Sequence, residues 1–327
     1  MNKTLLPLLA LILALASPAF SQRVVGYTSL GTYNGAGTYV QNAPNPVTNK
    51  IYANSSTSLG YTTTIDVISG TTHKITTSVT ANAGVAALVV NPTTNKIYSM
   101  NQDATITVID GSVDQVVATI PALTTDTCIN NLAIDDSANK LVVIDYCGLT
   151  VYVLDGSSYA LLATVNIPLE YGSTVAVNPV THLLYITGDF DHAYAAIDLT
   201  AYTATKVSVS GNPYGVAVDT TYNRIYIGDD VSEILYEFNG AANTQVRTVA
   251  LNYNAYGLAV NQKTHILAAY EDNESVYFFH DLNLTADGQI SFGPKYILNL
   301  SVNSTNNLFY VGVSPSNEVA YIQGPTH

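Results

Sequence analysis

Tyrosine and carboxylate side chains are the residues of this sequence whose types and positions could bind a ligand. Several lie in short polar segments between strand-like segments in the second half of the chain. Carboxylates and aromatic rings together can hold a divalent cation, a cationic group or a sugar, through charge and stacking. The six candidate ligand-binding residues are Tyr171, Tyr214, Tyr256, Asp189, Asp229 and Asp272. We expect no cofactor, with bound Ca²⁺ as the one alternative, because oxygen ligands of this kind suit it.

The histidines do not indicate a catalytic metal centre. They are His73, His182, His192, His265, His280 and His327, and no two are two or four residues apart, as paired zinc ligands often are. No Gly-x-Ser-x-Gly segment supports a serine nucleophile. Four aspartates recur once per repeat and are interpreted as turn formers, not as a converging glycosidase pair: Asp66, Asp110, Asp155 and Asp198. The sequence therefore predicts no catalytic residues and no metal ligands.

A repeated octapeptide predicts the elements that position these residues. Asn91-Pro-Thr-Thr-Asn-Lys-Ile-Tyr98 recurs closely at 45–52 and more loosely in five further copies. The copies begin at Asn45, Asn91, Asp135, Asn178, Asp219, Asn261 and Asn303, with spacings of 46, 44, 43, 41, 42 and 42 residues. A period in the forties with strand-like content is typical of propeller blades, so seven copies predict seven blades.

Three positions of the repeat explain its local structure. The first Asn or Asp can accept a backbone N–H in an Asx turn. Four residues later comes Asn or His, which tolerate the left-handed backbone that a tight turn needs. Two residues further on, every copy is apolar: Ile51, Ile97, Leu141, Leu184, Ile225, Leu267 and Phe309. The histidines at 182 and 265 occupy the Asn position and are explained as turn formers.

Each repeat contains four strands, which we label a to d outward from the propeller axis. In the second copy they are expected at 86–90, 96–100, 105–109 and 115–120, with alternating apolar and polar residues in the last two. The seventh copy ends after its third strand at 319–322, and an unassigned strand at 24–28 precedes the first copy. We therefore predict that the N-terminal strand completes the last blade.

These repeats resemble the YVTN-type, YncE-like seven-bladed β-propeller family. The resemblance is carried by the Asn-Pro turn, the Ile-Tyr strand start and Val-Ile-Asp-Gly at Val108–Gly111, and it covers about residues 24–322. Strand b departs from the family pattern in Tyr52-Ala53-Asn54. The family includes cell-surface proteins, a periplasmic DNA-binding member and relatives resembling sugar lactonases. The resemblance therefore implies an architecture more than an activity.

The N-terminus predicts export. A basic start with Lys3, an apolar run from Leu5 to Ala16 and small residues before position 22 are typical of a secretory signal peptide cleaved after Ser21. The expected domains are a signal peptide at 1–21 and a single propeller at 22–327, secreted or periplasmic. The mature chain has 10 basic and 24 acidic residues, a net charge of −14, which disfavours nucleic acid as a partner. No other stretch is apolar enough to span a membrane.

The two cysteines predict a disulfide. Cys128 and Cys147 lie equally far from the centre of the a–b turn at Ser137-Ala138, so they should face each other across this hairpin. An oxidising compartment favours the bridge. Closing a loop of this length contributes about 3 kcal/mol in the chain-entropy model.

The distribution of charge predicts where a function lies. Loops b–c and d–a emerge on one face of a propeller, and 11 of the 24 acidic residues fall in the b–c loops. We expect this acidic, tyrosine-rich face, richest in blades four to six, to make the protein a binding or surface interaction module for a protein, a glycan or a cationic ligand. One alternative is a lactonase-like hydrolase with a metal at the channel mouth. The other is a purely structural surface protein whose acidic face only maintains solubility.

Overall fold

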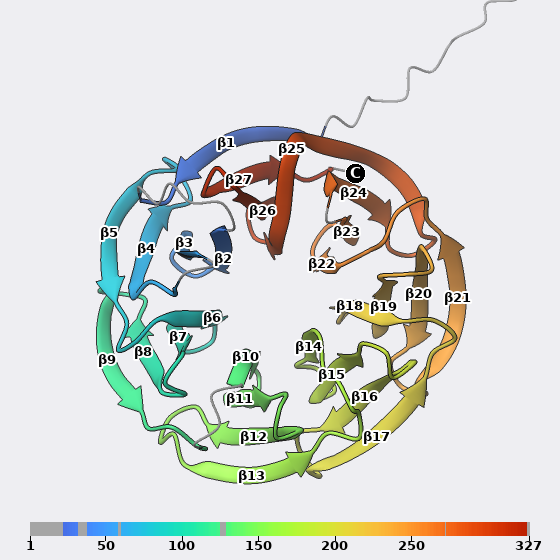
Figure 1. Ribbon diagram of the computed structural model, residues 1–327, viewed down its shortest axis with the longest axis horizontal. Coiled ribbons are helices and arrows are strands. Elements are labelled where there is room, and N and C mark those ends of the chain that lie inside the picture. The colour runs from blue at the N-terminus through green and yellow to red at the C-terminus, as the bar shows by residue number, and fades with distance from the viewer. Residues whose placement is uncertain (1–21, 32–37, 58–59, 125–128, 272, 326–327) are drawn as a thin grey trace, which may run out of the picture.

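The strands form blades around a central axis, and each blade is a four-stranded antiparallel sheet (Figure 1). The computed structural model describes residues 22–31, 38–57, 60–124, 129–271 and 273–325, and every regular element in these ranges is a strand. The first strand of each blade lies nearest the axis, as predicted. The chain is an all-β, seven-bladed propeller.

In each of blades one to three, the four strands lie side by side in the order in which they occur in the chain. They contain β2 (Thr38–Asn45), β3 (Lys50–Thr57), β4 (Thr64–Ser69) and β5 (Ile75–Thr80); β6 (Val85–Asn91), β7 (Lys96–Asn101), β8 (Ile106–Asp110) and β9 (Gln115–Ile120); and β10 (Ile129–Asp135), β11 (Lys140–Asp145), β12 (Thr150–Asp155) and β13 (Leu161–Asn166).

The same order continues through blades four and five and into blade six. These contain β14 (Val175–Asn178), β15 (Leu183–Gly188), β16 (Ala193–Asp198) and β17 (Thr203–Ser208); β18 (Pro213–Asp219), β19 (Arg224–Asp229), β20 (Ile234–Asn239) and β21 (Thr244–Ala250); and β22 (Gly257–Asn261), β23 (Ile266–Tyr270) and β24 (Asn273–His280).

The last two blades share one long strand. The first part of β25 (Thr285–Asn303) pairs with β24 as the outer strand of blade six, and its second part pairs with β26 (Leu308–Ser314) as the inner strand of blade seven. β27 (Glu318–Gln323) follows, and β1 (Arg23–Ser29) pairs with it antiparallel. The N-terminal strand therefore completes blade seven, which confirms the predicted closure of the ring.

The second strand of each blade supplies the core. Its apolar position, occupied by Ile, Leu or Phe in the seven copies, is almost fully buried in every blade. The tyrosines next in sequence are equally buried: Tyr52, Tyr98, Tyr185, Tyr226 and Tyr310. Each fully buried side chain of this size contributes roughly 2 kcal/mol or more. Because each blade packs on its two neighbours, the core is a series of blade interfaces.

The a–b turns have the predicted backbone. Asn91 Oδ1 accepts from the amides of Thr93 and Thr94 at 2.9 and 3.2 Å, which makes an Asx turn. The residue four positions after each anchor has a left-handed φ of 49–56° in all seven blades: Asn49, Asn95, Asn139, His182, Asn223, His265 and Asn307.

The same residues also join adjacent blades, which the sequence analysis did not predict. At six of the seven junctions the anchor side chain of one blade contacts the left-handed residue of the next, an arrangement that we call the inter-blade clasp; where both are asparagine, Nδ2 of the anchor donates to Oδ1 of the left-handed residue. Between blades seven and one, Asn306 Nδ2 donates to Asn49 Oδ1 at 3.0 Å in place of the anchor. The four Asn–Asn clasps are Asn45–Asn95 at 2.7 Å, Asn91–Asn139 at 3.0 Å, Asn178–Asn223 at 2.9 Å and Asn261–Asn307 at 2.7 Å. In two clasps an Asp–His pair replaces Asn–Asn: Asp135–His182 and Asp219–His265, both at 2.7 Å.

A third position completes each clasp. In the c–d turn, a backbone N–H donates to the carbonyl oxygen of the left-handed residue in every blade. Five blades have glycine there, because a Cβ would lie only 2.2–2.5 Å from the asparagine Oδ1: Gly70, Gly111, Gly156, Gly240 and Gly324. The two blades with histidine instead carry Leu199 and Asp281. The predicted turn role holds for Asp110, Asp155 and Asp198, but Asp66 lies inside β4 and Ser69 makes that turn.

Two sequence predictions concern residues outside the described ranges. The signal peptide at 1–21 and Cys128 both lie there, so the cleavage site and the disulfide with Cys147 stay predictions. The hairpin has the expected register from the turn as far as Asn131 opposite Ile144, but a register shift follows, and Ile129 lies opposite Asp145, one residue out of the register predicted for the cysteines. Among the described residues, no helix has the length and apolarity needed to cross a membrane.

Candidate ligand-binding site

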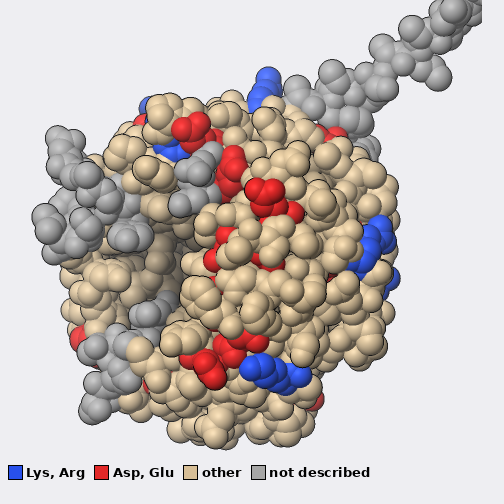
Figure 2. Space-filling view, turned by 45° about the vertical axis from the view of Figure 1, so that its right-hand side comes forward, with Lys and Arg blue, Asp and Glu red and all other residues tan. Residues whose placement is uncertain are grey.

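The larger of two cavities along the propeller axis lies on the side of the b–c and d–a loops, which we call the loop face. It has a volume of about 490 Å³ and is bordered mainly by polar side chains, including Gln41, Asn131, Thr174, Tyr214, Tyr256 and Asn299. A smaller cavity of about 260 Å³ lies toward the opposite end and is bordered mainly by apolar residues of the inner strands. Figure 2 shows acidic side chains on the loop face beside the hollow at the ring centre. The channel thus has one polar and one apolar end.

Tyr214 and Tyr256 lie together at the polar end. Their rings meet edge to face, with centroids 5.5 Å apart at 78°. Thr174 and Thr187 both donate hydroxyl hydrogen bonds to the Tyr214 carbonyl oxygen at 2.5 Å. Gly257 follows Tyr256 because a Cβ there would lie 2.1 Å from a ring carbon of Tyr270. The Tyr214 carbonyl is thus held by two threonine hydroxyl groups, and the Tyr256 amide donates to the Tyr270 carbonyl oxygen at 3.0 Å.

Asn212 organises the carboxylates of blades four and five. Its Nδ2 donates to Asp189 Oδ1 and Asp230 Oδ1, both at 2.7 Å. Its backbone N–H donates to Asp229 Oδ2 at 2.7 Å, and its Oδ1 accepts from the Phe190 amide at 2.6 Å. We call Asn212 with these three aspartates the acidic hub. One amide side chain thereby joins two b–c loops to the d–a loop between them.

The three carboxylates of the acidic hub have different environments. Asp229 is fully buried, and its oxygens accept from the amides of Asn212, Val231 and Ser232, so it fixes the loop and does not face solvent. Burial raises the pKa of Asp230, and the charges of Asp189 and Asp229 add to this against the donation from Asn212. Asp189 and Asp230 are thus the half-exposed acids of this group.

Tyr171 forms a separate aromatic rim. Its side chain is exposed, as is Phe190, and their rings meet edge to face with centroids 6.3 Å apart. Asp191 holds this loop, because its Oδ2 accepts from the amides of Glu170 and Tyr171 at 2.8 and 2.9 Å. Burial opposes ionisation of Asp191, but Lys206 and these amides outweigh it and keep its pKa below the usual range.

The structure thus brings together some of the predicted residues and separates others. Tyr214 and Tyr256 adjoin the cavity, Asp189 and Asp229 belong to the acidic hub, and Tyr171 lies on the rim. Asp272 is outside the described residues. Sequence reasoning missed Asn212, since a single asparagine in a loop has no pattern that indicates its role.

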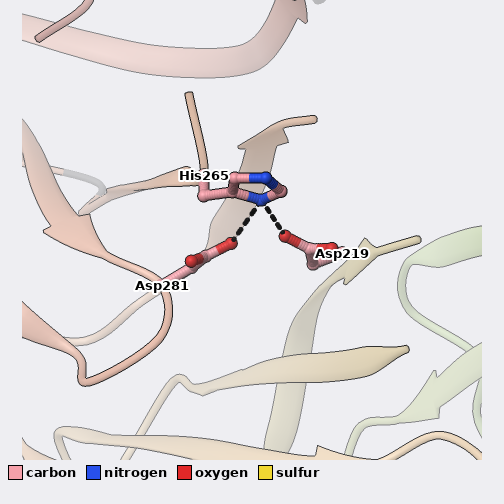
Figure 3. A group of neighbouring side chains, drawn as sticks. All are labelled: Asp219, His265 and Asp281. Atoms are coloured by element: carbon pink, nitrogen blue, oxygen red, sulfur yellow. Dashed lines mark hydrogen bonds and ion pairs between the residues drawn. The ribbon is translucent and has the colours of Figure 1, made fainter. Parts of the chain in front are cut away.

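The opposite face, formed by the a–b and c–d turns, holds a second group that the sequence analysis did not select (Figure 3). His265 Nδ1 lies 2.7 Å from Asp219 Oδ2 and 3.6 Å from Asp281 Oδ2. Burial, and then the adjacent Asp219 carboxyl group, raise the pKa of Asp281 to about 9. Burial works against ionisation of Asp219, but Asp281, the Tyr222 amide and His265 outweigh it and lower its pKa. Of this pair, Asp219 is therefore the stronger acid and Asp281 the weaker one.

The fold and these two sites define the chain as a seven-bladed propeller with a polar, tyrosine-bordered cavity on its loop face. No family model matches the sequence, and no curated protein matches it.

Proposed function

We propose that this protein is an exported binding module that holds a glycan in the loop-face cavity. The observation that carries the proposal is the cavity of about 490 Å³, in which neutral polar side chains surround the Tyr214–Tyr256 pair. Sugars are bound by hydroxyl, amide and aromatic groups acting together.

The charges near the cavity favour a neutral or cationic ligand. The acidic hub lies between blades four and five, and its Asn212 is two residues from Tyr214 along the chain; the Asp229 oxygens already accept from backbone amides. The full sequence has a formal net charge of −13, and a chain this acidic repels anions in general. The cavity itself offers amide and hydroxyl groups, which pair with hydroxyl groups without requiring a charged ligand.

Export and family membership belong to the same proposal. The sequence of residues 1–21 supports secretion to the periplasm or the cell exterior, with cleavage after Ser21. The Asn-Pro turn and the Ile-Tyr strand support a relation to YVTN-type propellers. N-terminal sequencing of the protein recovered outside the cytoplasm tests cleavage, and a first residue other than Gln22 would contradict the predicted site.

The test of binding uses the chain from residue 22 onward on a glycan array, followed by calorimetric titration of any ligand found. Tyr256→Ala removes one ring of the pair, and we expect its affinity to fall about 5- to 150-fold, since stacking of this kind contributes about 1–3 kcal/mol. Tyr27→Ala is the matched control, because Tyr27 is an exposed tyrosine on the outermost strand of blade seven. Equal losses in both variants, or no glycan bound at all, would refute the proposal.

The hydrolase alternative requires three carboxylate or imidazole groups around one point at the channel mouth. Within the described ranges, the three such groups that converge are Asp219, His265 and Asp281, and they lie in the turns of the opposite face, not at this mouth of the channel. Binding therefore has the better support. A chain that binds no ligand on the array would leave the purely structural alternative.

A further inference from the structure

We propose that Asp219, His265 and Asp281 form a binding site for one divalent transition-metal ion that cross-links blades five and six. Asp219 ends β18 in blade five, whereas His265 and Asp281 lie in the a–b and c–d turns of blade six. One ligand atom of each side chain lies within 4.8 Å of the others. Figure 3 shows both carboxylates directed at the imidazole Nδ1.

The other Asp–His clasp, between blades three and four, shows that Asp281 is the unusual residue of this group. There the same clasp is made by Asp135 and His182 at 2.7 Å, and the c–d turn position is Leu199. An Asp–His clasp is therefore complete without a second carboxylate. Asp281 occupies the position of Leu199 and adds a buried acid that the clasp does not need.

The surroundings of the Asp281 carboxyl group favour a bound cation. Its side chain is about 1% exposed, and neither carboxyl oxygen makes a hydrogen bond of normal geometry; its neighbours are the Asp219 carboxyl group and His265, whose Nδ1 lies 3.6 Å from Oδ2. Asp219, in contrast, accepts from the amides of Thr221 and Tyr222 and contacts His265. The nearby basic residues Arg224 and Arg247 are engaged by Glu237. A buried carboxyl group placed against a second carboxyl group, with its imidazole neighbour beyond hydrogen-bond distance, is costly, and a cation bound between the three groups offsets that cost.

The donor set identifies the class of metal. One imidazole nitrogen with two carboxylate oxygens suits Zn²⁺ or Mn²⁺, whereas Ca²⁺ and Mg²⁺ prefer oxygen alone. Ligand atoms around a tetrahedral Zn²⁺ are separated by about 3.4 Å, so the present separations need changes of roughly 1 Å. The His265 side chain is 25% exposed, which leaves a route for the ion and a fourth position for water.

The test titrates Zn²⁺ into untagged, chelator-treated protein by calorimetry, with Co²⁺ absorption as a second readout of ligand geometry. We expect one equivalent of Zn²⁺ and a rise in melting temperature, because binding only the folded state stabilises it. Asp281→Leu copies the arrangement of blade four and should fold cooperatively, yet lose more than about 100-fold in Zn²⁺ affinity, since even second-shell changes cost about 10- to 100-fold.

His182→Asn is the control, because it changes the equivalent histidine in a blade without the second carboxylate. Its Zn²⁺ affinity should equal that of the wild type. No stoichiometric binding by the wild type, or undiminished binding by Asp281→Leu, would overturn the proposal. Glycan binding at the loop face should be unaffected by Asp281→Leu, so the two proposals fail independently.

Discussion

Replacing Asn91 with alanine removes every side-chain hydrogen bond of one inter-blade clasp residue. The Asn91 side chain is fully buried; its Oδ1 accepts from the amides of Thr93 and Thr94, and its Nδ2 donates to Asn139. Each hydrogen bond contributes about 1 kcal/mol, and groups left unpaired add to the loss, so we expect the free energy of unfolding to fall by about 2–4 kcal/mol. In a chain of this size that lowers the melting temperature by about 4–8 °C.

The assay is urea denaturation of the chain from residue 22 onward, followed by circular dichroism and tyrosine fluorescence, since the sequence has 24 tyrosines and no tryptophan. Thr93→Ala, at an exposed position in the same turn, should stay within about 0.5 kcal/mol of the wild type. The double mutant with Asn139→Ala isolates the bond between blades, with an expected coupling energy of about 1 kcal/mol. A coupling energy near zero would refute the clasp as a link between blades, leaving Asn91 a role in its turn alone.

Three further outcomes can be measured on the same protein. Gly257→Ala should cost about 1–3 kcal/mol because its Cβ would overlap a tyrosine ring, whereas Gly60→Ala, with no atom within 4 Å of that Cβ, should be nearly neutral. The pKa of Asp191 is lowered in the folded protein, so its ionised form stabilises the fold above its ordinary pKa of about 4, and this stabilisation is lost on acidification. Asp191→Asn should therefore lower the free energy of unfolding by about 2 kcal/mol at pH 7 and by less below pH 4. Peptide mapping without reductant should recover Cys128 linked to Cys147, and both thiols free would contradict the predicted bridge.

The fold was predictable because its determinants are local and repeated. The period gave the number of blades, and the apolar and left-handed positions gave the strand faces and turns. The closure by β1 followed from counting strands, since the seventh copy lacks one and the N-terminus has one to spare. Each of these inferences uses residues within a single repeat or at the chain ends.

Contacts between blades were missed, although the sequence contains a signal for them. Histidine appears at the left-handed position only where the preceding copy begins with Asp, as in Asp135–His182 and Asp219–His265. The two residues of each pair lie in different repeats, so a pattern sought within single repeats does not contain the pair. The burial of Asp229 had no comparable signal, because an acid that caps a loop and an acid that faces solvent look alike in a sequence.

The two faces of the propeller differ in how freely their residues can change. On the turn side, the anchor contacts the left-handed residue of the next blade, and the space beside that residue admits glycine but no Cβ. The anchor, the left-handed residue and the glycine must therefore change together. The Tyr214–Tyr256 pair and Asn212 occur only between particular blades, so a ligand site can change there without disturbing the clasps. Asp281 is the exception, because Leu199 shows that an Asp–His clasp folds without a second acid. A carboxylate that folding does not require, buried against an imidazole, is best explained by a cation that it helps to bind.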